Sequence, residues 1–222
     1  YPDMAEEAAL EAYIERAAAA GCQRAFLSLI LESLHFAGAR RPDAPVFMRA
    51  VRACAVRNLS VWCDLNDAAI ETFGGLDAAL NRLADMGVCG VRIDSGLSIE
   101  ALAAVSRHES GLGLQLNCAA LRPDRPQTIS LAQKLLERIE REGDPKRIEA
   151  CFNFYPRCGT GISEQAVAAA CGWLRARGVR VSAFVASRAA PSMLHAPSRG
   201  VPTVETLRYA APYTAARILT FL

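Results

Sequence analysis

The feature that most constrains the fold is a repeated unit, in which a helix-like stretch leads through a glycine or an asparagine into a short apolar run. In one copy, Ala5–Ala20 has the period of an amphipathic helix, Gly21 is placed to cap its C-terminus, and Arg24–Ile30 (RAFLSLI) is predicted to be a strand. Five more strand-like runs follow in order, at Leu59–Leu65, Gly90–Asp94, Leu112–Cys118, Ile148–Tyr155 and Val179–Val185. The chain is therefore predicted to be an α/β protein.

Helix-like stretches separate these runs, at Val46–Arg57, Leu76–Met86, from about Ser98, at Thr128–Glu142 and at Glu164–Arg177, and a last helix is expected to begin near Thr203. Strands that alternate with helices and are apolar along most of their length are typical of parallel strands buried on both faces. A barrel and an open doubly wound sheet both fit this pattern. An open sheet that binds nucleotides normally has a glycine-rich turn after its first strand, and neither G-x-G-x-x-G nor G-x-x-x-x-G-K-[ST] occurs here. We therefore favour a TIM (β/α)8 barrel.

A complete barrel of this kind has eight strands, which is more than the repeated unit supplies. The chain opens at Tyr1-Pro2 directly before a helix and stops at Phe221-Leu222 directly after one, so we expect most of strand 1 and all of strand 8 to be missing. Two open parallel edges would favour aggregation. Residues 1–222 are therefore expected to form a single barrel domain that is a fragment of a longer protein.

The composition limits the class of partner. A formal charge of +2, from 25 basic and 23 acidic residues, gives no field of one sign that nucleic acid or an anionic membrane would select. No apolar run reaches the roughly eighteen residues of a membrane helix, and no signal peptide is evident. The expected partner is a small molecule, with no nucleic acid and no membrane.

The distribution of cysteine, histidine and lysine narrows the chemistry further. The eight cysteines are scattered without a Cys-x-x-Cys pair, which is typical of reduced thiols in a core, and the three histidines have no spacing suited to zinc. The two lysines, Lys134 and Lys146, are expected on a helix and in a loop before a strand, away from the site. Schiff-base, pyridoxal-phosphate and metal-dependent chemistry are therefore disfavoured, and carboxylates remain the main chemical groups.

The active site of such a barrel forms where the strands end, so the polar residues that close each apolar run are the candidates. They are Ser28, Asp64, Asp94, Asn117, Asn153, Tyr155 and Ser187, with Glu32 near the first of them. Carboxylates, carboxamides and hydroxyls suit the binding and protonation of a sugar.

Two of these candidates, Asp64 and Asp94, are expected to end adjacent strands, which lie about 4.8 Å apart in a sheet. Like charges at close range favour one protonated and one ionised carboxyl group, which is the pair that a glycosidase needs. The alternative is a structural role, in which either aspartate pairs with an arginine such as Arg92 or caps a helix.

From the middle of the chain onward, an ordered set of short segments resembles one family. The segments are V-R-I-D-S-G at Val91–Gly96, L-Q-L-N at Leu114–Asn117, N-F-Y-P at Asn153–Pro156, T-G-I-S at Thr160–Ser163, A-F-V-A-S at Ala183–Ser187 and G-V-P-T-V-E-T-L-R at Gly200–Arg208. They are similar to segments of the barrel domain of the MupG-type 6-phospho-N-acetylmuramidases, and the opening Y-P and F-L-S-L at Phe26–Leu29 match in order too. The resemblance covers essentially the whole chain.

The resemblance implies a cytoplasmic bacterial hydrolase of peptidoglycan recycling. It would cleave the β-1,4 bond between 6-phospho-N-acetylmuramic acid and N-acetylglucosamine, without a cofactor. The family normally adds a cyclophilin-like C-terminal domain, which is absent from this chain. Where the family tends to have a histidine before N-F-Y-P, this chain has Phe152, and the loop Arg188–Arg199 also differs, so the phosphosugar substrate is left open.

Roles follow as hypotheses. Asp94 and Asp64 are the first choices for acid and base, with Glu205 as the alternate carboxylate, although an acidic residue in the first turn of a helix is favourable without any function. Asn117, Asn153, Tyr155 and Ser28 are candidates for sugar contacts. Ser187, Thr203 and Arg208 are candidates for the 6-phosphate or the lactyl carboxylate, because barrels often bind phosphate near the seventh and eighth loops.

Two other readings stay open: an isomerase or epimerase of another phosphorylated sugar, and a degenerate barrel without catalysis. The sequence leaves the oligomeric state open.

Overall fold

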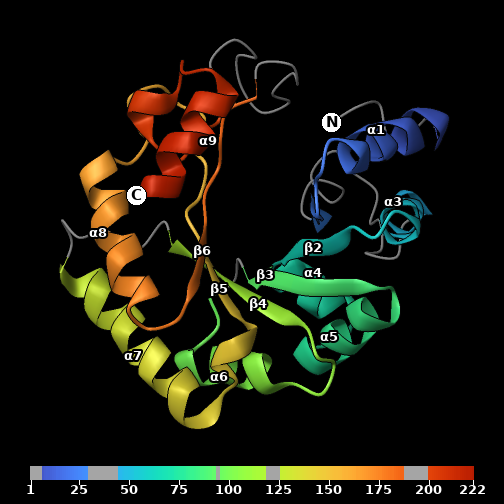
Figure 1. The fold of residues 1–222 in the computed structure, drawn as a ribbon. Helices are drawn as coiled ribbons and strands as arrows, with labels where there is room; N and C mark the ends of the chain where they lie inside the picture. The colour runs from blue at the N-terminus through green and yellow to red at the C-terminus, as the bar shows by residue number, and fades with distance from the viewer. Residues whose placement is uncertain (1–6, 30–44, 94–95, 119–125, 188–199) are drawn as a thin grey trace. The chain divides into compact units, whose positions relative to one another are not determined.

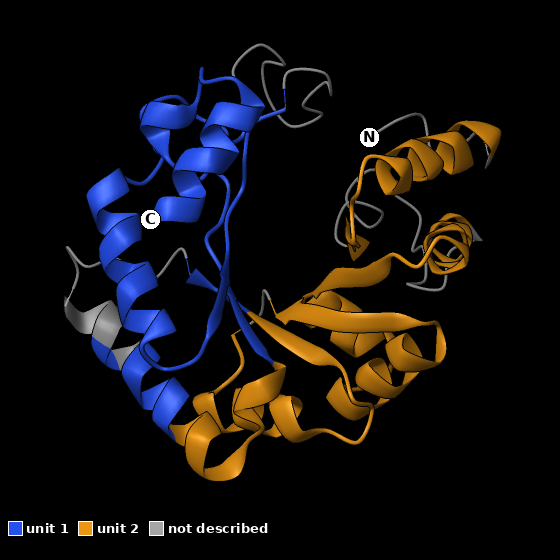
Figure 2. Cartoon of the chain, in the orientation of Figure 1, with its two compact units in different colours: residues 1, 116–137, 148–222 blue, residues 2–115, 138–147 orange. Residues whose placement is uncertain are grey.

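The computed structural model describes residues 7–29, 45–93, 96–118, 126–187 and 200–222 (Figure 1). The chain divides into two compact units, coloured separately in Figure 2. One unit contains residues 2–115 and 138–147, and the other contains residues 1, 116–137 and 148–222. Within the part of the chain that is described, the strands are parallel wherever pairing is defined and follow the order β1-β2-β3-β4-β5-β6.

The unit built on residues 2–115 alternates helices with the first strands. Its elements are α1 (Glu7–Ala19), β1 (Arg24–Leu27), α3 (Pro45–Val56), β2 (Ser60–Leu65), α4 (Asp67–Thr72), α5 (Leu76–Asp85), β3 (Val88–Ile93), α6 (Ile99–Arg107), the start of β4 (Gly113–Asn117) and the short 3-10 helix η2 (Pro145–Arg147). Local signals set these boundaries. Asn66 Oδ1 accepts from the amide of Ala69 to cap α4, and Ser98 Oγ accepts from the amide of Ala101 to cap α6. Gly87, at a φ of 93°, turns the chain from α5 into β3.

The two faces of this part of the sheet differ in character. Val61, Cys63 and Leu65 of β2 are buried on one face, together with helix residues such as Leu80 and Leu83 of α5.

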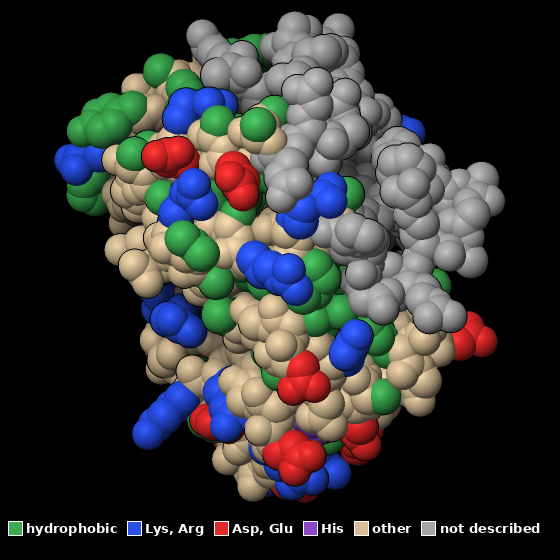
Figure 3. Space-filling view, turned by 90° about the vertical axis from the view of Figure 1, so that its right-hand side faces the viewer, with side chains coloured by type: hydrophobic (Ala, Val, Ile, Leu, Met, Phe, Trp, Pro, Cys, Tyr) green, Lys and Arg blue, Asp and Glu red, His purple; other side chains and the backbone are tan. Residues whose placement is uncertain are grey.

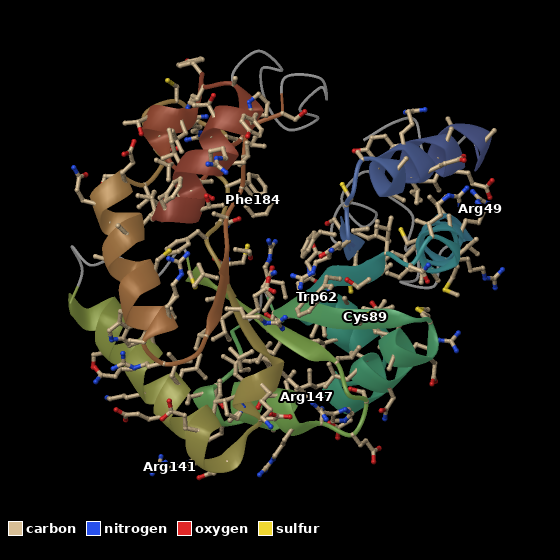
Figure 4. All side chains as sticks on the ribbon, in the orientation of Figure 1. Arg49, Trp62, Cys89, Arg141, Arg147 and Phe184 are labelled. Carbon is tan, nitrogen blue, oxygen red and sulfur yellow. The ribbon has the colours of Figure 1, made fainter. Side chains whose placement is uncertain are left out.

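The other face is organised by Trp62, labelled in Figure 4. Trp62 pairs in register with Gly90 of β3, which leads to Gly113 of β4. A Cβ atom added to either glycine would lie 2.5 Å from the indole, so only glycine leaves room for the ring. Asp64, Arg92 and Gln115 occupy the next register positions along the same face and are all buried.

The other unit contains the later strands and helices. Its elements are the end of β4, most of α7 (Pro126–Glu142), β5 (Ile148–Cys151), α8 (Glu164–Arg175), β6 (Arg180–Ser182), the 3-10 helix η4 (Glu205–Leu207) and α9 (Pro212–Phe221). β5 and β6 pair with Ala150 opposite Val181 and Cys151 opposite Ser182. Phe152, which follows β5, is completely buried, and Phe154 packs edge-on against Phe184, labelled in Figure 4.

The predicted α/β class, the six strands and their parallel arrangement are confirmed within the described residues. Several boundaries were wrong. β1 ends at Leu27 rather than at Ile30, β5 ends at Cys151 rather than at Tyr155, β6 covers only Arg180–Ser182, and the last helix begins at Pro212 rather than near Thr203. The short helix α4 was not predicted.

The error at Thr203 has a physical cause. The amide of Thr203 donates to the carbonyl of Phe184 at 3.0 Å, and its carbonyl accepts from Ile162 at 2.9 Å. The backbone N–H and carbonyl of Thr203 are therefore both hydrogen-bonded to other segments and cannot begin a helix there. Only the single 3-10 turn η4 follows before Pro212. The prediction of a helix start near Thr203 rested on its position directly after Pro202.

The surface is mixed in charge. On the face shown in Figure 3, Lys and Arg side chains are interspersed with Asp and Glu side chains among the described residues, as expected from a net charge of +2. No helix in the described ranges is long and apolar enough to cross a membrane.

Candidate active site

Asp64 is a buried carboxylate at the carboxyl end of β2, with only 3% of its surface exposed. Two neighbouring groups at the end of β1 hold it. Ser28 Oγ donates to Oδ2 at 2.6 Å, and the backbone N–H of Leu29 donates to Oδ1 at 2.6 Å. The strand register explains this contact. Leu27 pairs with Cys63, so the residues that follow them in the chain, Ser28 and Asp64, lie side by side. Both oxygens of the carboxylate therefore act as acceptors at a fixed position.

The neighbouring strand brings a cation to the same level. Arg92 of β3 pairs in register with Asp64, and 8% of its surface is exposed. Its guanidinium carbon lies 4.8 Å from the ring centre of Phe26 on β1, so the cation spans the strand between them. β2 and β3 are adjacent, as the sequence predicted for the strands that precede Asp64 and Asp94. Asp94 itself follows Ile93, the last residue of β3, and lies outside the described residues.

In the other unit, Thr203 joins the ends of β5 and β6. Its hydroxyl oxygen accepts from the amide of Phe184 at 2.8 Å and lies 3.0 Å from the carbonyl oxygen of Asn153, to which it donates. The residue is fully buried. This side chain therefore holds two strand extensions together.

Glu205 and Arg208 form a bidentate ion pair. Arg208 Nε donates to Glu205 Oε1 at 2.7 Å, and a terminal guanidinium nitrogen donates to Oε2 at 2.6 Å. The amides of Gly159 and Gly161 donate to the same two oxygens, each at 2.8 Å. The Arg208 side chain is completely buried, whereas that of Glu205 is 26% exposed.

The guanidinium of Arg208 has further acceptors in the carbonyls of Arg157 and Gly200. Its hydrogen bonds hold the pKa of Glu205 down at about 2, and the amides of Gly159 and Gly161 act in the same direction. In turn the Glu205 carboxylate raises the pKa of Arg208. The pair ties the loop at residues 157–161 to η4.

The remaining candidates lie in the unit that contains residues 116–137 and 148–222, at the end of β4 or beyond the ends of β5 and β6. Asn117 is the last residue of β4 and is half-buried. Asn153 and Tyr155 follow β5; Asn153 Oδ1 accepts from the amide of Phe154, and the amide of Tyr155 donates to the carbonyl of Pro202. Ser187 is exposed at the edge of the described residues.

Comparison with known protein families identifies the family of this chain. The family model described as "6-phospho-N-acetylmuramidase, N-terminal" matches residues 1–222, the whole chain. The chain belongs to this family. The name of the family is that of a glycosidase-type enzyme. No curated protein matches the chain.

Solved structures with the same fold accompany the family match. An uncharacterized protein of B. cereus has a TM-score of 0.73 at 22% identity over 96% of this chain and 53% of its own. A conserved Enterococcus faecalis protein of unknown function has a TM-score of 0.70 at 25% identity, over 93% of this chain and 52% of its own. This muramidase-family chain thus spans about half the length of those proteins.

Sequence reasoning assigned no site role to Gln115 and Glu149 of this muramidase-family chain. Both are buried strand residues, and Glu149 Oε1 accepts from Ser182 Oγ at 3.0 Å. A polar residue inside an otherwise apolar run is the signal that would have marked them, because a buried polar group needs hydrogen-bond partners.

Most of the cysteines are core thiols, as the sequence predicted, but Cys22, Cys89 and Cys158 are exposed. Five of the eight are buried and none forms a disulfide. Burial raises the pKa of Cys118 well above its usual range, and the nearby Cys151 and Cys171 thiols add to that shift. Burial likewise raises the pKa of Cys63 beside Asp64. Among the described residues, no group of three His, Cys, Asp or Glu side chains could hold a metal ion.

Proposed function

We propose that this chain is the catalytic part of a glycoside hydrolase that cleaves 6-phospho-N-acetylmuramyl-β-1,4-N-acetylglucosamine, a disaccharide of peptidoglycan recycling in the bacterial cytoplasm. The family match over residues 1–222 supports the class of substrate and reaction. We further propose that the six strands belong to a (β/α)8 barrel, a single domain that the full protein completes.

The observation that carries the proposal is Asp64. It is a carboxylate at the carboxyl end of a parallel strand, the position at which barrel enzymes place their catalytic groups. Its two oxygens are oriented by fixed donors, and the adjacent strand β3 leads directly into Asp94. We assign Asp64 and Asp94 as the catalytic pair, one acting as acid and the other as base or nucleophile.

The roles of the other candidates follow from their contacts. Asn117, Asn153, Tyr155 and Ser187 are assigned to the sugar and its anionic substituents. The bonds of Thr203, Glu205 and Arg208 to neighbouring backbone groups favour a bracing role for these three residues over direct contact with the substrate. The barrel is proposed to need no cofactor, because two carboxylates suffice for glycoside hydrolysis.

The test is release of N-acetylglucosamine from the 6-phosphorylated disaccharide by the full protein. Asp94→Asn is compared with Asp67→Asn, which alters an exposed aspartate in the first turn of α4. We expect cleavage by wild type and by Asp67→Asn, little cleavage by Asp94→Asn, and none of the unphosphorylated disaccharide. A folded wild-type protein that leaves the phosphorylated disaccharide intact would contradict the proposal.

A further inference from the structure

Ser28 stands in an unusual relation to the proposed catalytic carboxylate. It is the first residue after β1, half-buried, and its hydroxyl lies 2.6 Å from Asp64 Oδ2. A serine hydroxyl has a single proton. Because that proton is donated to Asp64, Ser28 cannot at the same time donate a hydrogen bond to a sugar.

The second anchor of Asp64 makes the contribution of Ser28 specific. The Leu29 amide restrains Oδ1 and the Ser28 hydroxyl restrains Oδ2, so the two donors together oppose rotation of the carboxylate about its bond to Cβ, a torsion that has a broad energy profile in aspartate. Ser28 and Leu29 together therefore set both the position and the plane of the Asp64 carboxylate.

We propose that Ser28 is a positioning residue, which acts on the reaction through Asp64 and without touching the substrate. This inference rests on the proposed function, because it takes Asp64 as one of the reacting carboxylates. Misplacement of a catalytic group by about 1 Å costs about 100-fold in rate, so loss of the Ser28 hydrogen bond to Asp64 has a measurable effect.

The same two strands supply a matched control. Ser60, at the start of β2, donates through its hydroxyl to the carbonyl of Gln23 at 3.2 Å, and so links β1 to β2 at the end remote from Asp64. If the Ser28 hydroxyl served only to join the two strands, loss of either hydroxyl would have a similar effect.

The experiment measures kcat, KM and Tm of the full protein with Ser28→Ala, Ser28→Thr, Ser60→Ala, Asp64→Asn and the double variant Ser28→Ala with Asp64→Asn. We expect Ser28→Ala to lower kcat by about 10- to 100-fold with KM within about twofold of wild type. Ser28→Thr, which keeps the hydroxyl, restores most of the rate, and Ser60→Ala retains it. In the Asp64→Asn background, removal of the Ser28 hydroxyl has no further effect on kcat.

Three results overturn the assignment. An unchanged kcat in Ser28→Ala removes any role in the reaction. A raised KM with unchanged kcat makes Ser28 a substrate contact. Effects of Ser28→Ala and Asp64→Asn that multiply in full show that Ser28 acts independently of Asp64.

A measurement without substrate separates this inference from the proposed function. The carbon-13 NMR signal of the Asp64 side-chain carboxyl, assigned by its loss in Asp64→Asn, is expected to shift in Ser28→Ala and not in Ser60→Ala. A signal that stays in place overturns the positioning role whatever the activity. Wild-type protein that cleaves no disaccharide overturns the proposed function and the catalytic role of Ser28 with it, whereas the NMR shift then still establishes the contact itself.

Discussion

Two carboxylates, one in each compact unit, are held by neighbouring hydrogen-bond donors in contrasting ways. Asp64 accepts hydrogen bonds from a hydroxyl and an amide just after the end of the neighbouring strand β1, and 3% of the residue is exposed. Glu205 accepts hydrogen bonds from two amides of a glycine-rich loop and from the guanidinium of Arg208, which directly follows η4. Its side chain is 26% exposed. The loop R-C-G-T-G at residues 157–161 has few side chains that could pack, so the ion pair supplies the contacts that fix it.

A carboxylate can therefore be chosen as a catalytic candidate only when its hydrogen-bond and ion-pair partners are known. Glu205 is matched to a completely buried arginine, and removal of either partner would leave the other with uncompensated charge. Its environment accounts for its presence without any reaction. Asp64 lies at the carboxyl end of a parallel strand, where the proposed barrel would place its catalytic groups.

The largest expected effect separates the two carboxylates by activity. Asp64→Asn should lower kcat by roughly 10²- to 10⁴-fold, the usual contribution of a general acid or base. Glu205→Gln should leave kcat within a few-fold of wild type at a temperature where it is folded. Steady-state hydrolysis of the phosphorylated disaccharide measures both. Equal losses in the two variants would remove the distinction between a reacting and a bracing carboxylate.

The next effect concerns stability in the Glu205 region. Arg208→Met keeps much of the aliphatic stem but removes the charge that Glu205 and the carbonyls of Arg157 and Gly200 require. Loss of one partner of a buried ion pair costs about 3–5 kcal/mol in the free energy of unfolding. Urea denaturation of the full protein measures it. Arg177→Met is the control, because Arg177 stacks over Trp173 on the exposed side of α8 and should change stability by less than about 1 kcal/mol.

Two glycines, one near each carboxylate, allow a test with a smaller expected loss of stability. A Cβ atom at Gly90 would lie 2.5 Å from the Trp62 indole, on the sheet face that carries Asp64, and one at Gly161 would lie 2.7 Å from Glu205 Oε2. Each alanine variant should lose about 1–3 kcal/mol, the usual cost of overpacking. Gly90→Ala should also lower kcat, because the displaced ring lies beside Asp64, whereas Gly161→Ala should not. Gly172→Ala, whose new Cβ would meet no neighbouring group within 4 Å, is the control without overpacking, and it should raise stability by about 0.5–1 kcal/mol because glycine is unfavourable inside helix α8.

The sequence predicted the α/β class and the strand order well because apolar runs and glycine caps are local signals. Gly21, Asn58 and Gly87 all have positive φ and all precede a strand as expected. The strands also brought Ser28 beside Asp64, two residues that the sequence had selected separately from the ends of their runs. The sequence could not predict the hydrogen bond between Ser28 and Asp64, because these residues are 36 positions apart and their contact depends on the register of β1 against β2.

The sequence failed where long-range contacts override local preference. At Thr203, Phe184 and Ile162 bond the backbone while Asn153 accepts from the hydroxyl, and none of these residues is near in sequence. Arg208 had the features of an anion-binding arginine, yet its nearest acceptor is Glu205, three residues away. An i, i+3 pair of opposite charge can be seen in the sequence, but complete burial of the arginine cannot.

The smallest expected effect is the dependence of stability on pH in the Glu205 region. The hydrogen bonds from Arg208 lower the pKa of Glu205 from 4.5 to about 2 in the folded protein. Because the folded value is the lower one, the unfolded chain binds the proton first as the pH falls, and the ion pair stabilises the fold fully only above the unfolded value. That contribution should decline between about pH 5 and pH 2, as the folded carboxylate also becomes protonated. The measurement is the difference in free energy of unfolding between wild type and Glu205→Gln at pH 7, 5, 4 and 3, which should be largest at pH 7 and shrink at each step below pH 5. A difference that is constant over this range would mean that the charge of Glu205 contributes nothing to the brace and that only the shape of its side chain matters.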